Sequence, residues 1–263
     1  MVLQRLVQPV LNVFSSPKCG LCDRPTHTIL CHDCQTQFLS CQSTNPQQFW
    51  QPPLPVFAWG QYTGVLKRGI AALKYDNQPD IAQLLGQWLG EAWLRSRLAQ
   101  SSTKPSSART SATGGLNHHR RVPRSLLVIP APANESKKKR RGYDQAELIA
   151  RAFCRYTRLP LGLRRVYRTK DTLPMYGLSR QDRYLNVQGK FCLHPRFEQQ
   201  IARQIKRQGK HRHRQAPAIL LLDDIHTSGA TLGAIAQLLR QHQLSVYGAV
   251  TVAKAGVGQD KPS

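Results

Sequence analysis

The residues best suited to chemistry lie in the stretch ILLLDDIHTSGAT, residues 219–231. Two adjacent aspartates, Asp223 and Asp224, follow a run of aliphatic residues that is typical of a buried strand. Adjacent carboxylates in proteins hold metal ions, act as acid and base, or accept hydrogen bonds from the vicinal hydroxyls of a sugar. The loop that follows the aspartates decides between these three uses.

This loop has the composition of a phosphate site. Its residues are Thr227, Ser228, Gly229, Ala230 and Thr231. They open a helical pattern, and backbone N–H groups at a helix N-terminus bind anions. The hydroxyls add donors, and glycine lets the backbone approach a ligand closely. A phosphate here would place a sugar across Asp223 and Asp224, so the stretch predicts a ribose 5-phosphate site. The structural alternative is a strand end followed by an ordinary N-cap.

The first part of the chain contains a cysteine pattern that is typical of a metal site. Two Cys-x2-Cys pairs are eight residues apart, and they consist of Cys19, Cys22, Cys31 and Cys34. Such pairs wrap four thiolates around Zn²⁺, and four protein ligands leave no position for water. The pattern therefore predicts a structural zinc ribbon. The alternatives are free or disulfide-bonded cysteines, or His27 or His32 in place of one cysteine.

The chain is strongly basic, with 38 Lys and Arg against 14 Asp and Glu and a net charge of +24. Such an excess attracts polyanions, above all nucleic acid or phosphorylated ligands. Part of it lies in aperiodic stretches near residues 100–124 and 207–216, which we expect to be disordered inserts. Diphosphate or nucleic-acid contacts are predicted for Lys74, Lys139, Arg140 and Arg141. The alternative for the last three is a solvated basic loop.

No run of 18 uncharged apolar residues is present, so no membrane span is expected. The first 14 residues lack the pattern of an export signal, and their apolar residues follow helical spacing. We therefore expect a cytoplasmic protein whose thiols stay reduced.

The order of strand and helix patterns predicts an α/β fold with a parallel sheet. Strands are expected in 125–132, 219–224 and 245–255, and helices in 81–98 and 230–243. The basic residues after residue 135 are expected to form a loop that runs into a further helix. The expected core face of that helix comprises Leu148, Ile149, Ala152, Phe153 and Tyr156. The four tryptophans are also assigned to helix or core positions, although platforms for single-stranded nucleic acid usually interleave aromatics with cations; these are Trp50, Trp59, Trp88 and Trp93.

ILLLDDIHTSGAT resembles the phosphoribosyl-pyrophosphate motif of type I phosphoribosyltransferases, and the whole chain resembles the ComF family. The other stretches that carry the second resemblance are ALKYDNQPDIA (72–82), RRGYDQAELIA (140–150) and LSRQDRYLNVQGKF (178–191). The resemblance implies an N-terminal helix and zinc ribbon in residues 1–50, followed by a phosphoribosyltransferase-like domain in residues 51–263. The chain departs from the family pattern at Asp144, which replaces a usual Asn, at His226, and at Asn77, where Gly is frequent. Asn77 is tolerable if its backbone is left-handed.

Two functions follow from this resemblance. The first is a component of natural transformation that binds a phosphoribosyl or nucleotide ligand, single-stranded DNA and a helicase-like translocase. The second is an active Mg²⁺-dependent phosphoribosyltransferase in nucleotide salvage, in which Asp223 and Asp224 would be catalytic. No motif names an acceptor, and fold alone does not establish a reaction. The net charge favours the first function, whereas the intact aspartates and phosphate loop keep the second open.

Overall fold

The structure, a computed structural model, describes residues 17–100, 125–169, 190–208 and 217–256. The amphipathic N-terminal segment, most of the stretch 178–191 and nearly all of the two predicted inserts lie outside these residues. Within the described ranges, no helix combines the length and the apolar character needed to cross a membrane.

A parallel four-stranded sheet forms the centre of the molecule, in the order β1-β6-β5-β2. Its strands are β1 (Val56–Gln61), β2 (Leu126–Pro130), β5 (Ala218–His226) and β6 (Val246–Lys254). These segments are almost continuously apolar because a parallel sheet is covered on both faces. The predicted α/β fold with a parallel sheet is confirmed.

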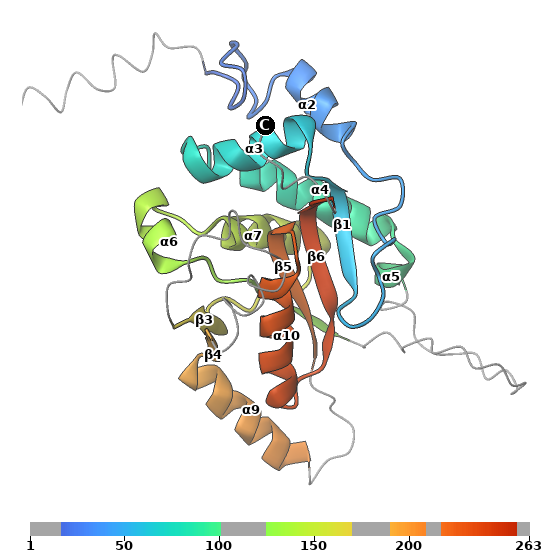
Figure 1. Ribbon diagram of the computed structural model, residues 1–263, viewed down its shortest axis with the longest axis vertical. Helices are drawn as coiled ribbons and strands as arrows, with labels where there is room; N and C mark the ends of the chain where they lie inside the picture. Colours follow the sequence, from blue (N-terminus) through green and yellow to red (C-terminus); the bar gives the residue numbers. More distant parts are fainter. Residues whose placement is uncertain (1–16, 101–124, 170–189, 209–216, 257–263) are drawn as a thin grey trace, which may run out of the picture.

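Helices cover both faces of this sheet, and Figure 1 shows α10 in front of it and α4 and α7 behind. The rear layer consists of α3 (Gly64–Tyr75), α4 (Ile81–Arg95) and α7 (Gln145–Thr157), and the front layer contains α9 (Pro195–Gln208) and α10 (Ala230–Gln241). Alternate residues of β5 face the two layers. Leu220 and Leu222 pack in the rear core, whereas Ile219 and Leu221 pack in the front core.

Smaller elements extend this framework. They are α2 (His32–Leu39), α5 (Arg97–Gln100) and the antiparallel pair β3 (Val166–Arg168) and β4 (Phe191–Leu193). The N-terminal unit shares the rear core, because the ring of Phe38 lies against Gly69 and 5.6 Å from the ring of Trp88. The domain boundary at residue 50 stays a prediction.

The expectation of a basic loop after residue 135 is wrong, because residues Glu135–Arg141 form the helix α6. The side chain of Asn134 caps it by accepting a hydrogen bond from the backbone N–H of Lys137 at 3.2 Å. Gly142, with φ +82°, ends it in the left-handed conformation. Local capping at both ends thus orders a segment whose composition alone is typical of a solvated loop.

The core assignment of Tyr156 is also wrong, since this residue is 40% exposed. Helices α4 and α7 are too close together for its ring to enter between them. A Cβ atom added to Gly90 of α4 would lie 3.2 Å from the Tyr156 ring, and one added to Gly86 would lie 2.4 Å from the carbonyl oxygen of Ile149. The ring therefore lies across Gly90 at the margin of the interface.

The close approach of α4 and α7 predicts opposite effects for two glycine substitutions. Gly86→Ala should lower the free energy of unfolding by about 1–3 kcal/mol, because its methyl group would overlap the backbone of α7. Gly233→Ala, in α10, should raise it by up to about 1 kcal/mol, since nothing lies within 4 Å of the added methyl group and alanine favours the helix. Urea unfolding measures both. Equal effects of the two substitutions would contradict the packing described.

Candidate functional site

The connections after β2 and β5 leave the sheet toward opposite faces, and we call the region between the carboxyl ends of these two strands the crevice. The two strands are neighbours, but α7 follows β2 in the rear layer and α10 follows β5 in the front layer. Ligands of open α/β sheets bind at the carboxyl ends of strands where the connections diverge in this way. The predicted phosphate loop after β5 therefore faces the turn and the helix α6 that follow β2.

The two aspartates point in different directions. Asp224 is 4% exposed, and its Oδ2 lies 2.8 Å from Nζ of Lys74 at the end of α3. Asp223 is partly exposed, and its Oδ1 accepts a hydrogen bond from the backbone N–H of Asp224 at 2.9 Å. Successive residues of a strand face opposite sides, which separates the carboxylates. Asp223 is thus the carboxylate that a ligand can reach, and the assignment of both aspartates to ribose stays a prediction.

Charge and burial act differently on Lys74 and Asp223. Burial by itself lowers the pKa of Lys74, but the carboxylate of Asp224 more than offsets this, so that the pKa is raised. Burial and the neighbouring charge of Asp224 raise the pKa of Asp223 well above its usual range. An ionised Asp223 is therefore costly in the free protein, and perturbed carboxyls of this kind are typical of functional sites.

The turn after β5 has a shape that only glycine fits. Gly229 has φ +79°, and a Cβ atom at this position would lie 2.9 Å from Nε2 of His226. The hydroxyl of Ser228 accepts a weak hydrogen bond from the N–H of Ala230 at 3.4 Å, at the start of α10. The structure thus places the predicted loop at the N-terminus of a twelve-residue helix, where an anion is favoured.

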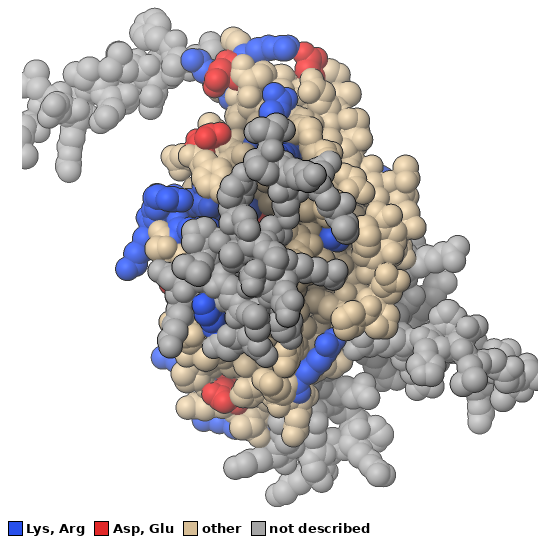
Figure 2. Space-filling view, in the orientation of Figure 1, with Lys and Arg blue, Asp and Glu red and all other residues tan. Residues whose placement is uncertain are grey.

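Cations gather on the opposite side of the crevice, on and around α6. Figure 2 shows Lys and Arg side chains clustered where α6 lies in Figure 1. Lys139 and Arg140 are exposed, while Arg141 lies 5.4 Å from the ring centroid of Tyr75 and donates a hydrogen bond to Gln145 Oε1 at 2.7 Å. Partial burial, followed by the charges of Arg141 and Lys74, lowers the pKa of Lys137. A bound anion would relieve this repulsion.

Asp144 is a further site residue, and it joins the two sides of the turn after β2. Its carboxylate accepts hydrogen bonds from the backbone N–H of Ala133 at 2.9 Å and of Glu147 at 3.2 Å. Burial raises its pKa, and these hydrogen bonds oppose that change. The spacing Asp-x2-Glu identifies an N-cap, but the contact with Ala133 spans eleven residues and could not be read from the sequence. Asn77 has φ +51°, so its backbone is left-handed and meets the condition under which Asn can replace Gly at this position.

Lys254 and a cavity beside the turn were missed by the sequence reasoning. Nζ of Lys254 donates a hydrogen bond to the carbonyl oxygen of Thr227 at 3.1 Å. Lys254 is paired with His226 across β5 and β6, and only the register of the sheet reveals this proximity. The cavity, of about 650 Å³, borders Ser228 and Gly229 and has an apolar wall formed by residues 49–56. A ligand held by the turn therefore has an apolar surface on its flank.

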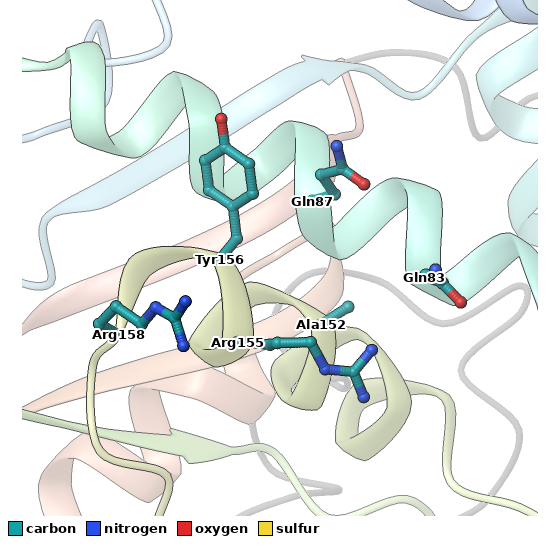
Figure 3. A pocket seen from close by; sticks show the side chains of 6 residues that line it. All are labelled: Gln83, Gln87, Ala152, Arg155, Tyr156 and Arg158. Atoms are coloured by element: carbon teal, nitrogen blue, oxygen red, sulfur yellow. The ribbon is translucent and has the colours of Figure 1, made fainter.

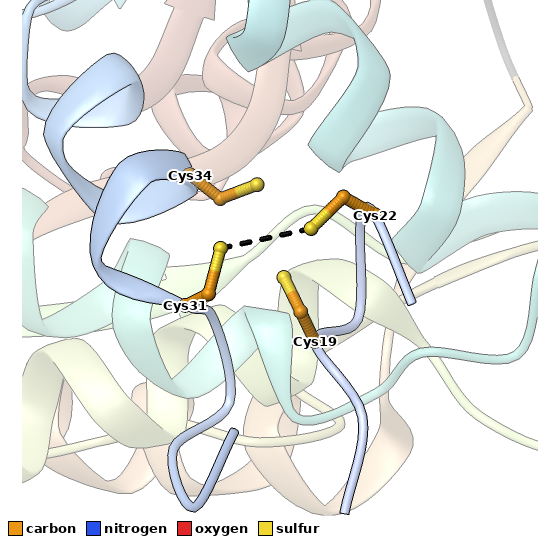
Figure 4. Close-up of side chains that lie close together, drawn as sticks. All are labelled: Cys19, Cys22, Cys31 and Cys34. Atoms are coloured by element: carbon orange, nitrogen blue, oxygen red, sulfur yellow. Dashed lines mark hydrogen bonds between the residues drawn. The ribbon is translucent and has the colours of Figure 1, made fainter. Parts of the chain in front are cut away.

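The four cysteines of the N-terminal unit point their sulfur atoms toward one another (Figure 4). All four sulfurs lie within 4.8 Å of one another, and those of Cys22 and Cys31 are 3.6 Å apart. A tetrahedral zinc with Zn–S bonds of about 2.3 Å requires separations of roughly 3.8 Å. Burial raises the pKa of Cys19, but hydrogen bonds from backbone N–H groups lower it to about 6, whereas burial and the neighbouring thiols raise the pKa of Cys34. The cluster therefore fits a bound metal ion.

No protein-family model matches this chain. Competence protein F of Haemophilus influenzae is 31% identical over 134 residues, which span 50% of this chain and 52% of that protein. The alignment thus covers about half the length of that relative. DNA utilization protein YhgH of Shigella flexneri is 27% identical over 89% of this chain and 86% of its own length. The protein of the same name from Escherichia coli is 26% identical over 84% of this chain and 83% of its own length. These relatives confirm the resemblance to the ComF family.

The buried contact between Lys74 and Asp224 predicts a strong coupling between the two residues. Lys74→Met should lower the free energy of unfolding by about 3–5 kcal/mol, because Asp224 would remain buried without a counter-charge. Adding Asp224→Asn should recover much of this loss. Urea unfolding of the single and double variants measures the coupling. Lys67→Met, on an exposed position of the same helix, is the control and should change stability by less than about 0.5 kcal/mol. A Lys74→Met variant as stable as this control would contradict the role of the pair.

Proposed function

We propose that this chain acts in the uptake or use of DNA, the roles that the names of Competence protein F and DNA utilization protein YhgH state for those relatives. It does so in the cytoplasm by binding a phosphoribosyl or nucleotide ligand in the crevice. The observation that carries this proposal is the arrangement of the Gly229 turn, the accessible carboxylate of Asp223 and the cations of α6 around one crevice. Each side matches a different part of a sugar phosphate.

The ligand binds in an orientation set by these groups. Its 5-phosphate lies at the N-terminus of α10, on the backbone N–H groups and hydroxyls of residues 227–231. The ribose hydroxyls donate hydrogen bonds to Asp223. Further phosphates extend toward Lys137 and Arg141, whose mutual repulsion they relieve. Mg²⁺ would accompany a diphosphate, keep most of its own water and neutralise part of the charge near Asp223.

Single-stranded DNA and a helicase-like translocase are the proposed macromolecular partners. The net charge of +24 far exceeds what a small ligand requires, and the exposed cations Lys139 and Arg140 extend the basic surface beyond the crevice. Contacts of this kind bind the phosphate backbone without regard to sequence. A protein that handles incoming DNA needs such general affinity.

The second candidate function is Mg²⁺-dependent phosphoribosyl transfer, and the position of Lys137 and Arg141 opposite the phosphate loop favours it. A nitrogen nucleophile would form a bond with C1 of phosphoribosyl pyrophosphate, while the C1–O bond breaks and its electron pair leaves with the diphosphate. Cations stabilise the charge that develops on such a leaving group. Pyrophosphate release in the presence of bases or amines distinguishes transfer from binding alone.

We further propose that the metal of the cysteine cluster is Zn²⁺ with a structural role. Four thiolates complete the tetrahedral coordination that zinc prefers and leave no position for water or substrate. Cys19 and Cys34 are buried in the same core as Phe38, so the metal would hold the N-terminal unit against α3 and α4.

For ligand binding, Asp223→Asn is the most informative change. Calorimetry with phosphoribosyl pyrophosphate and Mg²⁺ should show binding to the wild type and an affinity about 10-fold or more lower for the variant, since a hydrogen bond to a charged group contributes about 1.5–3 kcal/mol. Asp80→Asn, at an exposed position, should bind as the wild type does. Equal affinity of all three proteins would contradict the proposed role of Asp223.

The same variant should be more stable than the wild type, which separates lost binding from unfolding. The raised pKa means that folded Asp223 holds its proton more tightly than the unfolded chain does. Wild-type stability therefore falls as the pH rises from the unfolded pKa through the raised one. Asparagine removes this loss of stability, so the Tm of the variant should exceed that of the wild type. The difference should be about 2–4 °C for each kcal/mol of unfolding free energy that is recovered, and it should be larger at pH 8 than at pH 5.

Zinc should be present at about one atom per chain in purified protein. Cys19→Ser should remove most of it and lower the Tm, because binding of the metal contributes to the folding free energy. Cys41→Ser is the matched control, since Cys41 lies outside the cluster, and should retain zinc. Elemental mass spectrometry and thermal unfolding measure the two effects. A fully folded chain without metal would contradict the structural role.

A further inference from the structure

A second ligand-sized depression lies away from the crevice, between α4 and α7. It is a groove of about 330 Å³, seen in Figure 3. The residues that line it are Gln83, Gln87, Ala152, Arg155, Tyr156 and Arg158. α7 starts beside the crevice, where Asp144 caps it, and its 13 residues carry the chain about 20 Å away. This groove, which we call the α4–α7 groove, is therefore separate from the candidate site.

The packing of the two helices holds an aromatic ring at the surface of this groove. Gly86 and Gly90 are one helical turn apart on α4 and let α7 approach closely. The Tyr156 ring lies against Gly90, and the residue is 40% exposed. A ring supported on one side and open to solvent on the other can stack on a planar group with little loss of conformational entropy.

The arginines beside this ring carry charge that no acidic side chain in the described part of the chain offsets. Arg95 and Arg151, on the same two helices, form i,i+4 ion pairs with Glu91 and Glu147. In contrast, no acidic group among the described residues lies within ion-pair distance of Arg155 or Arg158. In Figure 3, Arg155 and Arg158 lie on either side of the point where Tyr156 leaves α7, and the Tyr156 ring points toward α4.

Two amide side chains complete the groove from the opposite helix. Gln83 and Gln87 are exposed on α4 and face the end of α7. An amide offers both donors and acceptors, so it can form hydrogen bonds with the edge of any nucleobase. The groove thus combines a stacking surface, neutral hydrogen-bonding groups and two cations that have no acidic partner among the residues that the structure describes.

We propose that the α4–α7 groove binds a segment of single-stranded nucleic acid. A base stacks on Tyr156, adjacent phosphates contact Arg155 and Arg158, and Gln83 and Gln87 contact base edges. Platforms for single strands combine aromatic side chains with cations in this way, because every base has a stacking face and every nucleotide a phosphate. A duplex does not expose its base faces, and an acidic peptide would leave the ring and the amides without a matching group. This inference rests on the proposed DNA-related function.

Fluorescence anisotropy with a labelled mixed-sequence single strand, at several salt concentrations, tests the groove in the full chain. Tyr156→Ala should weaken binding by about 5- to 150-fold, because stacking of one base contributes about 1–3 kcal/mol. Tyr156→Phe keeps the ring and should bind almost as the wild type does. The double variant Arg155→Gln/Arg158→Gln should reduce the slope of log affinity against log salt by about 1.4, or about 0.7 for each phosphate contact. Arg95→Gln/Arg151→Gln removes the same charge from paired positions and should leave the slope nearly unchanged.

The outcomes separate this inference from the proposed function. If the wild type binds single strands with a steep salt dependence and the groove variants keep its affinity and slope, the groove is not the site, although the DNA-related function stands. Groove variants that lose an acidic protein partner but not DNA also overturn the inference. If the wild-type protein has no affinity for single strands, both the inference about the groove and the proposed binding of single-stranded DNA are wrong. An unchanged Tm and unchanged binding of phosphoribosyl pyrophosphate show that a variant is folded. If Tyr156→Ala does not fold, the double variant Arg155→Gln/Arg158→Gln still tests the groove.

Discussion

The ion pair between Lys74 and Asp224 is the interaction on which the crevice depends. It joins the last turn of α3 to the carboxyl end of β5 with both side chains largely buried. The hydroxyl of Tyr143 donates to the carbonyl oxygen of Leu73 at 2.6 Å, which links the same turn to the start of α7. The pair also neutralises one of two adjacent carboxylates. Asp223 consequently remains as the accessible acidic group, and burial together with the charge of Asp224 raises its pKa more than Lys74 lowers it.

Around this pair, both sides of the crevice carry groups that favour an anion. The helix N-terminus after Gly229 favours an anion, and partial burial together with the charges of Arg141 and Lys74 lowers the pKa of Lys137 on α6. In the proposed complex, Asp223 would accept hydrogen bonds from the hydroxyls of the sugar. A sugar that carries phosphates satisfies all three groups at once, whereas a simple anion satisfies only two. The unfavourable electrostatics of the free site therefore favour this ligand class.

The two proposed sites place different demands on the fold. The crevice needs a carboxyl group whose charged form is unfavourable, since the pKa of Asp223 is raised, and such a group reduces stability. The α4–α7 groove instead depends on close helix packing at Gly86 and Gly90, which keeps the Tyr156 ring at the surface. The N-terminal unit packs on α3 and α4 of that rear layer through Phe38. Its cysteine cluster can therefore influence the stability of the layer that forms the groove.

The sequence by itself determined the features that are local along the chain. Apolar runs predicted the buried strands, cysteine spacing predicted the metal cluster, and a stretch of 13 residues brought Asp223 and the Gly229 turn together. Tertiary structure alone decided what depends on distant residues. The ion pair of Lys74, the anchor from Asp144 to Ala133 and the exposure of Tyr156 all follow from how helices pack on the sheet. Periodicity assigns a residue to a helix face, but it cannot show whether the neighbouring helix leaves room for its ring.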